Sequence, residues 1–281
     1  MRGVGLNRRV DVTVLCDAVA LFPEPVGDAL PGWTDEHQAW TAERAQGNVA
    51  PDGGWWLHFH TYLLTGDSSA MLVDTGIGPA GSAAADWLGT SGRLPDLLGT
   101  AGVTPDEIDT VVLTHVHLDH AGWNTDGARP RFANASYVLQ AAELEHIRGT
   151  ASYDRYLKAA DEAGQLRAVD GETDLAGVRV VPTPGHTPGH QSVVTARAVL
   201  AGDVLVHPAQ AAWPELTYVY ETEPAVAATS RRAVLALAGA YGVPLAPAHL
   251  HTPLRVNSGL GGPTSLPAEG AGTDRCPVQR L

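Results

Sequence analysis

The sequence predicts an α/β fold in which mixed β-sheets are covered by helices on their outer faces. Three observations predict it. Short β-branched runs occur with hairpin-like spacing, amphipathic helical segments interrupt them, and the length of 281 residues suits one large domain. We expect this domain to span residues 1–255, with an aromatic-rich N-terminal extension at residues 22–54. Residues 256–281, rich in Gly, Pro, Ser and Ala, are expected to form a poorly ordered tail.

The first elements are a strand and a long connection. Residues 10–16 alternate and are β-branched, which is typical of a strand. Residues 22–54 are rich in Pro, Gly and Trp without a clear period, and they predict a long loop. The tryptophans in or beside this segment, which indicate packing against the core, a dimer partner or a substrate pocket, are Trp33, Trp40, Trp55 and Trp56.

Strands and helices then alternate along the chain. Residues 57–65 and 70–74 predict a strand pair, and 81–101 carry apolar residues at mixed helical spacing. Residues 104–107 contain a helix-start signal with proline at the first helical position, and 110–114 predict a strand. The remaining predicted elements are strands at 136–139, 178–181, 191–195 and 198–200 and helices at 141–148, 153–163 and 224–240.

Composition limits the classes of function. Hydrophobic residues make up 44% and charged residues 17%, and no apolar run approaches the roughly 18 residues of a membrane span, so we expect a soluble protein without a membrane partner. The formal net charge of −13 argues against binding nucleic acid. Two cysteines, Cys16 and Cys276, cannot form a disulfide framework, and Asp11 and Asp17 interrupt any secretory signal. We therefore expect a cytoplasmic location.

The segment T-H-V-H-L-D-H at residues 114–120 follows an apolar strand. Alternate residues of an extended chain point the same way, so His115 and His117 can face one metal ion, and a following turn can present Asp119 and His120 to a second. Three histidines packed this closely would repel one another once protonated, whereas a metal ion keeps them neutral. The segment therefore predicts a metal site.

Two complete metal sites need further ligands at other strand ends. Three turn-rich segments follow predicted strands and carry suitable side chains: His186 in P-G-H-T-P-G-H, Asp203 in A-G-D and His249 in P-A-H. Each of these segments is a weak signal alone. His190 is the rival of His186, and His251 is an alternative ligand or a pocket residue.

Taken with V-D-T-G at residues 73–76, these motifs resemble those of the metallo-β-lactamase superfamily over about residues 57–251. The resemblance implies an αββα sandwich with two divalent ions, zinc first and manganese, iron or cobalt as alternatives, at one edge of two facing sheets. It favours His186 over His190 as the ligand, and it gives Asp74 a structural role. The implied ligands are His115, His117 and His186 for one ion, Asp119, His120 and His249 for the other, and Asp203 as the bridge.

The resemblance also implies a mechanism. Two close divalent ions share a water, lower its pKa and polarise a carbonyl or phosphoryl oxygen, and Asp119 can accept or return a proton. Asp203 at the bridging position is similar to the lactonase, glyoxalase II and organophosphate-hydrolase branches, whereas antibiotic-hydrolysing members typically have Cys or Ser there. Glyoxalase II-like enzymes carry a C-terminal helical domain, whereas a Gly/Pro-rich stretch follows His249 here, so we do not expect that thioesterase.

The expected activity is hydrolysis of a carboxylic ester or lactone by a lactonase-like or methyl-parathion-hydrolase-like enzyme. The alternatives are a phosphotriester or thioester hydrolase, a mononuclear-iron enzyme similar to persulfide dioxygenases, and a metal-stabilised binding protein, which the seven intact ligand positions disfavour. Many lactonases place a tyrosine three residues after the bridging aspartate, where this chain has Val206. His207, Tyr218 and Tyr220 are either its replacements or structural residues. We expect a small-molecule substrate and a homodimer through the Trp-rich segment.

Overall fold

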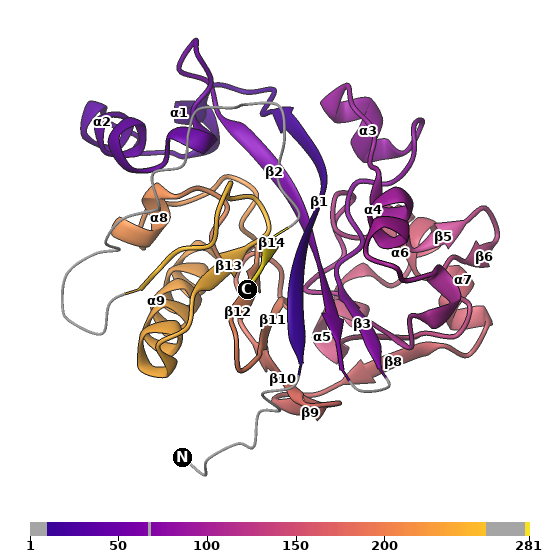
Figure 1. Ribbon diagram of the computed structural model, residues 1–281. Coiled ribbons are helices and arrows are strands. Elements are labelled where there is room, and N and C mark those ends of the chain that lie inside the picture. Colours follow the sequence, from indigo (N-terminus) through magenta and orange to yellow (C-terminus); the bar gives the residue numbers. More distant parts are fainter. Residues whose placement is uncertain (1–9, 67–68, 257–278) are drawn as a thin grey trace.

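The computed structural model describes residues 10–66, 69–256 and 279–281. Two β-sheets face each other, and helices lie outside both of them, as the resemblance implied (Figure 1). Helices α3 to α7 cover one sheet and helix α9 covers the other. The four layers are therefore helix, sheet, sheet and helix.

The larger sheet has seven strands in the order β14-β1-β2-β3-β4-β7-β8. Neighbours from β14 to β3 are antiparallel, and those from β3 to β8 are parallel. The sheet is thus mixed, as predicted. Its strands are β1 (Asp11–Leu21), β2 (Trp56–Thr65), β3 (Ala70–Val73), β4 (Thr110–Val112), β7 (Ser136–Gln140), β8 (Leu166–Val169) and β14 (Gln279–Arg280).

The smaller sheet has five strands in the order β13-β12-β11-β10-β9, and only the β12–β13 pair is parallel. A separate two-stranded ribbon joins β5 to β6. These strands are β9 (Thr173–Leu175), β10 (Val178–Pro182), β11 (Gln191–Val194), β12 (Val199–Gly202), β13 (Leu245–Pro247), β5 (Thr125–Asp126) and β6 (Arg129–Pro130).

The helices are short apart from α2 and α9. They are α1 (Val26–Ala29), α2 (Asp35–Arg44), α3 (Ala83–Leu88), α4 (Leu94–Thr100), α5 (Ala141–Ile147), α6 (Ala151–Tyr156), α7 (Lys158–Glu162), α8 (Ala209–Ala212) and α9 (Pro224–Tyr241), with 3₁₀ turns η1 (Gln46–Asn48) and η2 (Pro105–Glu107). No helix within the described ranges is both long and apolar enough to cross a membrane.

The main core fills the space between the sheets. Val12, Tyr62 and Val138 of the larger sheet pack with Val180 and Leu200 of the smaller one, and all five are buried. Alternate strand residues point to opposite faces, so Leu15 and Leu63 join an outer cluster with α4 instead. Burial of these apolar side chains on both faces fixes the strand register, because a slip of one residue would exchange the faces.

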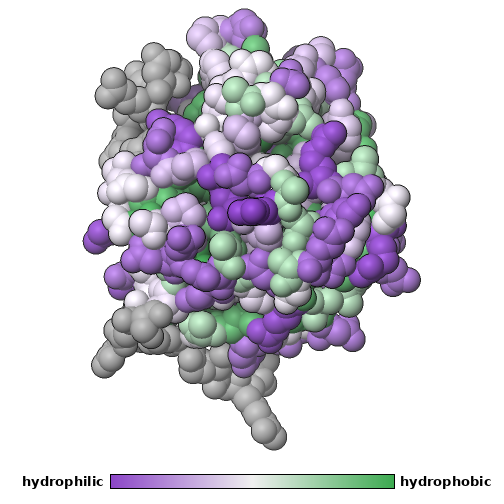
Figure 2. Space-filling view, turned by 90° about the vertical axis from the view of Figure 1, so that its right-hand side faces the viewer, coloured by the Kyte–Doolittle hydropathy of each residue, from purple (hydrophilic) through white to green (hydrophobic). Residues whose placement is uncertain are grey.

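The outer helices present polar residues to solvent. Figure 2 shows the face that the helices of the larger sheet form, with hydrophilic residues spread across it and hydrophobic residues between them. On the opposite side of the molecule, α9 buries Val234 and Ala238 against Val199 of the smaller sheet. Each outer layer therefore has one apolar face toward its sheet, as an amphipathic helix requires.

The prediction of a long loop over residues 22–54 is wrong, because α1, α2 and η1 lie within it. Helix α2 buries only Thr41, so the apolar stripe that would reveal it in the sequence is missing. Its start is a capping box in which the His37 side chain replaces the usual Glu or Gln and accepts from the Thr34 backbone N–H at 3.0 Å.

Two other predicted helices are each divided. The one at 81–101 becomes α3 and α4, because Gly89 ends α3 in the left-handed conformation with φ of 65°. The one at 153–163 becomes α6 and α7, which meet at Leu157. Of the predicted tail, residues 257–278 lie outside the described part, whereas β14 pairs with β1 and therefore departs from the prediction.

Candidate metal centre

The segment after β4 carries four of the predicted ligands and is held by Asp74. Thr114 donates its backbone N–H to Asp74 Oδ1 at 2.7 Å and its hydroxyl to Oδ2 at 2.8 Å. The same Oδ2 lies 2.9 Å from Nδ1 of His120. Asp74 therefore fixes both ends of the segment and orients the His120 ring, in the way that carboxylates behind metal ligands do.

The smaller sheet supplies the other three predicted ligands from strand ends. His186 follows β10, Asp203 follows β12 and His249 follows β13. All three are buried. The two sheets therefore deliver side chains to the same edge of the sandwich, where the resemblance placed the ions.

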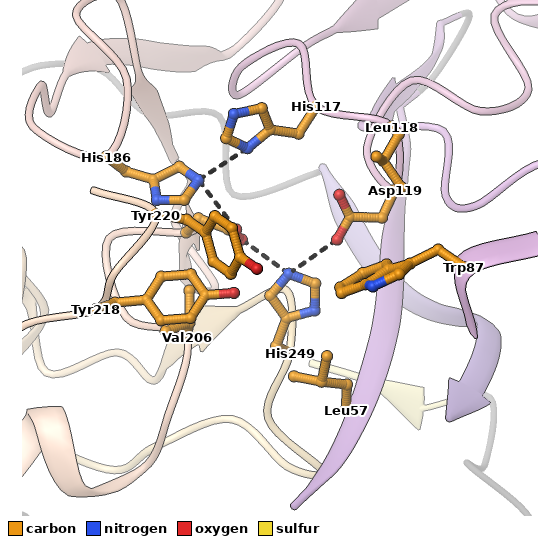
Figure 3. Close-up of a pocket in the computed structure, with 11 residues that line it drawn as sticks. Leu57, Trp87, His117, Leu118, Asp119, His186, Val206, Tyr218, Tyr220 and His249 are labelled. Carbon is orange, nitrogen blue, oxygen red and sulfur yellow. Dashed lines mark hydrogen bonds and ion pairs between the residues drawn. The ribbon is translucent and has the colours of Figure 1, made fainter. Parts of the chain in front are cut away.

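The structure brings the seven predicted ligands together in two groups. The first is His115, His117, His186 and Asp203, and the second is Asp119, His120 and His249, and each residue offers an atom within 4.8 Å of those of its group. Figure 3 shows His117, His186, Asp119 and His249 converging on one space from different directions. This grouping matches the one that the resemblance implied.

Asp203 lies between the two groups. Its Oδ1 is 3.2 Å from Nε2 of His120 and 3.1 Å from Nε2 of His249, whereas its Oδ2 is 3.4 Å from Nε2 of His186. Each carboxylate oxygen thus faces one group, which is the arrangement that a bridging ligand needs. Burial opposes ionisation of Asp203, but the histidines, led by His120 and His249, outweigh it and hold its pKa well below the usual range.

The donor atoms fit divalent metal ions. Nδ1 of His117 lies 2.9 Å from Nε2 of His115 and 3.0 Å from Nε2 of His186, so three ring nitrogens point at one another. Burial, followed by neighbouring histidines, lowers the pKa of His115 well below its usual value, which keeps the ring neutral. Neutral imidazoles and a carboxylate that converge in this way are the donor set that zinc prefers.

Glu143 connects the ligand-bearing segments, and the sequence reasoning missed it. This buried carboxylate in α5 accepts the Val116 N–H at 2.9 Å, the Thr187 hydroxyl at 2.6 Å and the Gly189 N–H at 3.2 Å. A Cβ at Gly189 would lie 2.0 Å from the backbone nitrogen of Glu143, so only glycine allows this approach. Nothing in the sequence distinguishes Glu143 from its neighbour Glu145.

His190, the rival of His186 in the sequence, is buried behind the ligands. Its Nε2 accepts the backbone N–H of Asp203 at 3.0 Å, and its Nδ1 lies 2.9 Å from the hydroxyl of Thr183. The ring thus positions Asp203 and does not belong to either ligand group.

A cavity of about 320 Å³ opens over both groups. Its floor is made by ligand residues and its walls are largely apolar and aromatic (Figure 3). The wall residues are Leu57, Trp87, Leu118, Val206, Tyr218 and Tyr220. The sequence predicted Tyr218 and Tyr220 as pocket candidates. It gave no pocket role to Trp87, which lies in a predicted helix, to Leu57, which lies in a predicted strand, or to Leu118, which lies in the T-H-V-H-L-D-H segment.

The other two pocket candidates lie elsewhere. His207 is buried between the rings of Trp33 and Trp55, at centroid distances of 4.8 and 5.0 Å, and it does not line the cavity. His251 packs against His58 with ring centroids 4.8 Å apart. Neither histidine lines the cavity, whereas Val206 does.

His207 predicts a pH dependence of stability. Burial lowers its pKa from 6.5 to about 3, with a smaller effect from His37, and its Nδ1 accepts the Ala209 N–H at 3.1 Å. Below pH 6.5 this histidine binds a proton in the unfolded chain but not in the folded one. The unfolding free energy therefore falls by about 1.4 kcal/mol for each unit by which the pH is lowered. His207→Asn should flatten the slope in urea denaturation between about pH 7 and about pH 5.

The control for this prediction is His146→Asn, at an exposed histidine of α5. It should keep the slope of the parent protein. An unchanged slope in the His207 variant would show that this ring becomes protonated without unfolding the chain.

The metallo-beta-lactamase superfamily model matches residues 55–249, which include all seven candidate ligands. The chain belongs to this superfamily. An N-acyl homoserine lactonase from a Bacillus species is 32% identical over 149 residues, which are 47% of this chain and 56% of that protein. The match thus spans little more than half the length of this curated relative.

Solved structures show the same fold over nearly the whole chain. A probable metal-dependent hydrolase from Staphylococcus aureus superposes with a TM-score of 0.76 at 18% identity and covers 94% of this chain and 99% of its own. A dizinc quorum-quenching lactonase in complex with a product reaches 0.75 at 18% identity, with coverage of 96% and 97%. At this identity the two structures show the shared fold, and the two candidate ligand groups lie within it.

Proposed function

We propose that this protein hydrolyses lactones or other carboxylic esters with two divalent metal ions, zinc first. The observation that carries the proposal is the position of Asp203 between two complete ligand groups at the floor of an apolar cavity. The similarity to N-acyl homoserine lactonases supports a lactone as the first substrate class to test.

The ions would supply an activated water and would polarise the substrate carbonyl. The chain's own residues would hold the ions and transfer protons to and from the reacting groups. Asp119 Oδ2 lies 3.4 Å from Nε2 of His249 and its side chain reaches the cavity, so it can accept a proton from the attacking water and return it to the leaving alkoxide. Asp203 stays ionised between the groups.

Tyr218 is the residue that we propose to contact the substrate carbonyl, because it lines the cavity beside the candidate ligands. Its ring is stacked on that of His186, with an interplanar angle of 12°, and Figure 3 shows its hydroxyl pointing toward the space beside His249. Burial, with added effects from Asp203 and Asp119, raises its pKa, so the hydroxyl stays protonated and can donate to a developing oxyanion. We propose that Tyr218 takes the role that a tyrosine after the bridging aspartate has in many lactonases.

The cavity walls favour an acyl or aryl substituent. Leu57, Trp87 and Leu118 offer apolar surface around the metal ligands, and Trp87 is partly exposed at the rim. Tyr220 is also half-exposed and donates its hydroxyl to Glu24 at 2.8 Å, so it closes one side of the rim. Burial of each additional methylene against these walls would contribute about 0.8 kcal/mol to binding.

The test is a pH-indicator assay of lactones, aryl esters, thioesters and phosphotriesters, run beside metal analysis of the protein by plasma mass spectrometry. We expect two metal ions in the two ligand groups, fastest turnover of lactones with an acyl chain, loss of turnover after chelation and recovery with zinc. A single iron per chain with oxygen uptake and no ester hydrolysis would contradict the proposal. Faster turnover of phosphotriesters than of lactones would change the proposed substrate class from carboxylic esters to phosphotriesters.

A further inference from the structure

A second set of metal-ligating side chains lies on the other face of β2, away from the candidate dinuclear centre. Cys16 of β1 and His60 of β2 are direct cross-strand partners, and His58 is two residues along β2 on the same face. Phe59, between the two histidines, points to the opposite face and contacts the ring of His249 at 5.1 Å. The sheet therefore separates this set from the ligands described above.

The three side chains converge in a buried space. Cys16, His58 and His60 each offer a ligand atom, and these atoms lie within 4.8 Å of one another. Their exposed fractions are 1%, 3% and 4%. A thiol and two imidazoles held at this separation match the donors of zinc sites with mixed sulfur and nitrogen ligands.

The tautomer of His58 leaves one ring nitrogen ready to bind. Its Nε2 lies 3.1 Å from the carbonyl oxygen of Gly47, which can only accept, so this nitrogen carries the hydrogen. Its Nδ1 therefore carries the lone pair, and this buried atom has no hydrogen-bond partner among the described residues. Metal-binding histidines commonly donate their other N–H to a backbone carbonyl in this way.

The neighbouring turn supports the set and adds an imidazole. The ring of His251 lies 4.8 Å from that of His58, and its backbone N–H is donated to Oδ1 of Asn48 at 3.1 Å. A Cβ at Gly47 would lie 2.3 Å from the His251 ring, so glycine is required for the ring to lie there. The imidazole of His251 is therefore close enough to His58 to be a candidate fourth ligand for an ion held by Cys16, His58 and His60.

We propose that Cys16, His58 and His60 form a third metal site, which binds Zn²⁺ in a structural role. On binding, the Cys16 thiol releases its proton to solvent and the thiolate forms the metal–sulfur bond. The ion would join β1 to β2 directly behind the strand residues that contact His249. This proposal does not depend on the hydrolase activity proposed above.

Cobalt substitution tests the site, because the candidate dinuclear centre contains no cysteine. After chelation and loading with Co²⁺, we expect a thiolate-to-cobalt charge-transfer band in the near ultraviolet. Cys16→Ser should abolish the band, and Cys276→Ser, the matched cysteine control, should retain it. His58→Ala, which keeps the thiol, should weaken cobalt binding and shift or remove the band.

Metal content gives a second readout. The zinc-loaded parent protein should hold three ions per chain by plasma mass spectrometry, and Cys16→Ser and His58→Ala should each hold two, with circular dichroism to confirm that they are folded. A protein without the charge-transfer band at saturating cobalt, or a band that Cys276→Ser removes and Cys16→Ser retains, would overturn the proposal. If the parent protein shows the charge-transfer band with cobalt but hydrolyses no ester or lactone with zinc, the result would count against the proposed function alone.

Discussion

Asp119→Ala should lower kcat/KM for the best ester or lactone substrate about 10²- to 10⁴-fold. The change removes the carboxylate that lies 3.4 Å from Nε2 of His249 and 3.6 Å from Nε2 of His120, so the second ligand group keeps only two histidines. It also removes the group placed to accept a proton beside the substrate. The measurement is steady-state hydrolysis, with metal content determined on the same samples.

Two variants make this result interpretable. Asp126→Ala removes an exposed aspartate of β5 and should leave both turnover and metal content unchanged. Asp119→Asn retains an oxygen ligand but not the charge, so it should keep more metal than Asp119→Ala while remaining slow. Undiminished turnover in Asp119→Ala after loss of an ion would mean that hydrolysis needs only the first ligand group.

Glu143→Ala should be among the most destabilising single changes, lowering the unfolding free energy by about 3 kcal/mol. The carboxylate accepts from Val116, Thr187 and Gly189 in a buried setting, and its loss leaves these donors without their acceptor. Urea denaturation of the metal-loaded protein measures the change. Because Val116 lies between His115 and His117 and Thr187 follows His186, metal affinity should fall about 10- to 100-fold as well.

Glu145→Ala is the matched control, since it removes an exposed glutamate from the same helix. Its stability should stay within about 0.5 kcal/mol of the parent protein. The unfolding free energy of Glu143→Gln should lie between those of the Glu143→Ala and Glu145→Ala variants. The amide keeps one accepting oxygen, but its NH₂ group faces N–H or O–H groups that also donate. Equal stability of the Glu143 and Glu145 variants would mean that water replaces the lost acceptor.

Part of the ligand set could be predicted from a local signal, because His115, His117, Asp119 and His120 are close in sequence. His186, Asp203 and His249 lie in turn-rich segments that follow strands, and the resemblance to the superfamily joined these weak signals to the set. The structure brings all seven together at one edge of the two sheets. Their ligand roles remain a prediction until metal content is measured.

The supporting residues could not be predicted because distant segments give them their roles. Glu143 matters only because the turns at Val116 and Gly189 approach α5, and no periodicity records that approach. Trp87 reaches the cavity from α3, whose sequence suggested only a helix. His207 is the converse case. Its position near Asp203 in sequence left a pocket role and a structural role open, and its side chain packs between Trp33 and Trp55.

Helix α2 was missed for a different reason. It has no apolar stripe, and its capping box uses His37 where the usual pattern has Glu or Gln. Residues 22–54, which are rich in Pro, Gly and Trp, were therefore predicted to be irregular although they contain a helix. Tertiary contacts such as the ring contact between Trp40 and Trp213, with centroids 5.6 Å apart, supply what local periodicity does not.

Each ligand group takes residues from both sheets, and this division has a thermodynamic consequence. An ion bound by His115 and His186, or by His120 and His249, would link one sheet to the other. This coupling is reciprocal. If a bound ion stabilises the packing of one sheet against the other, that packing stabilises the bound ion by the same free energy. Metal affinity would then be a collective property of the sandwich, sensitive to the packing of residues such as Val180 that never touch the ions.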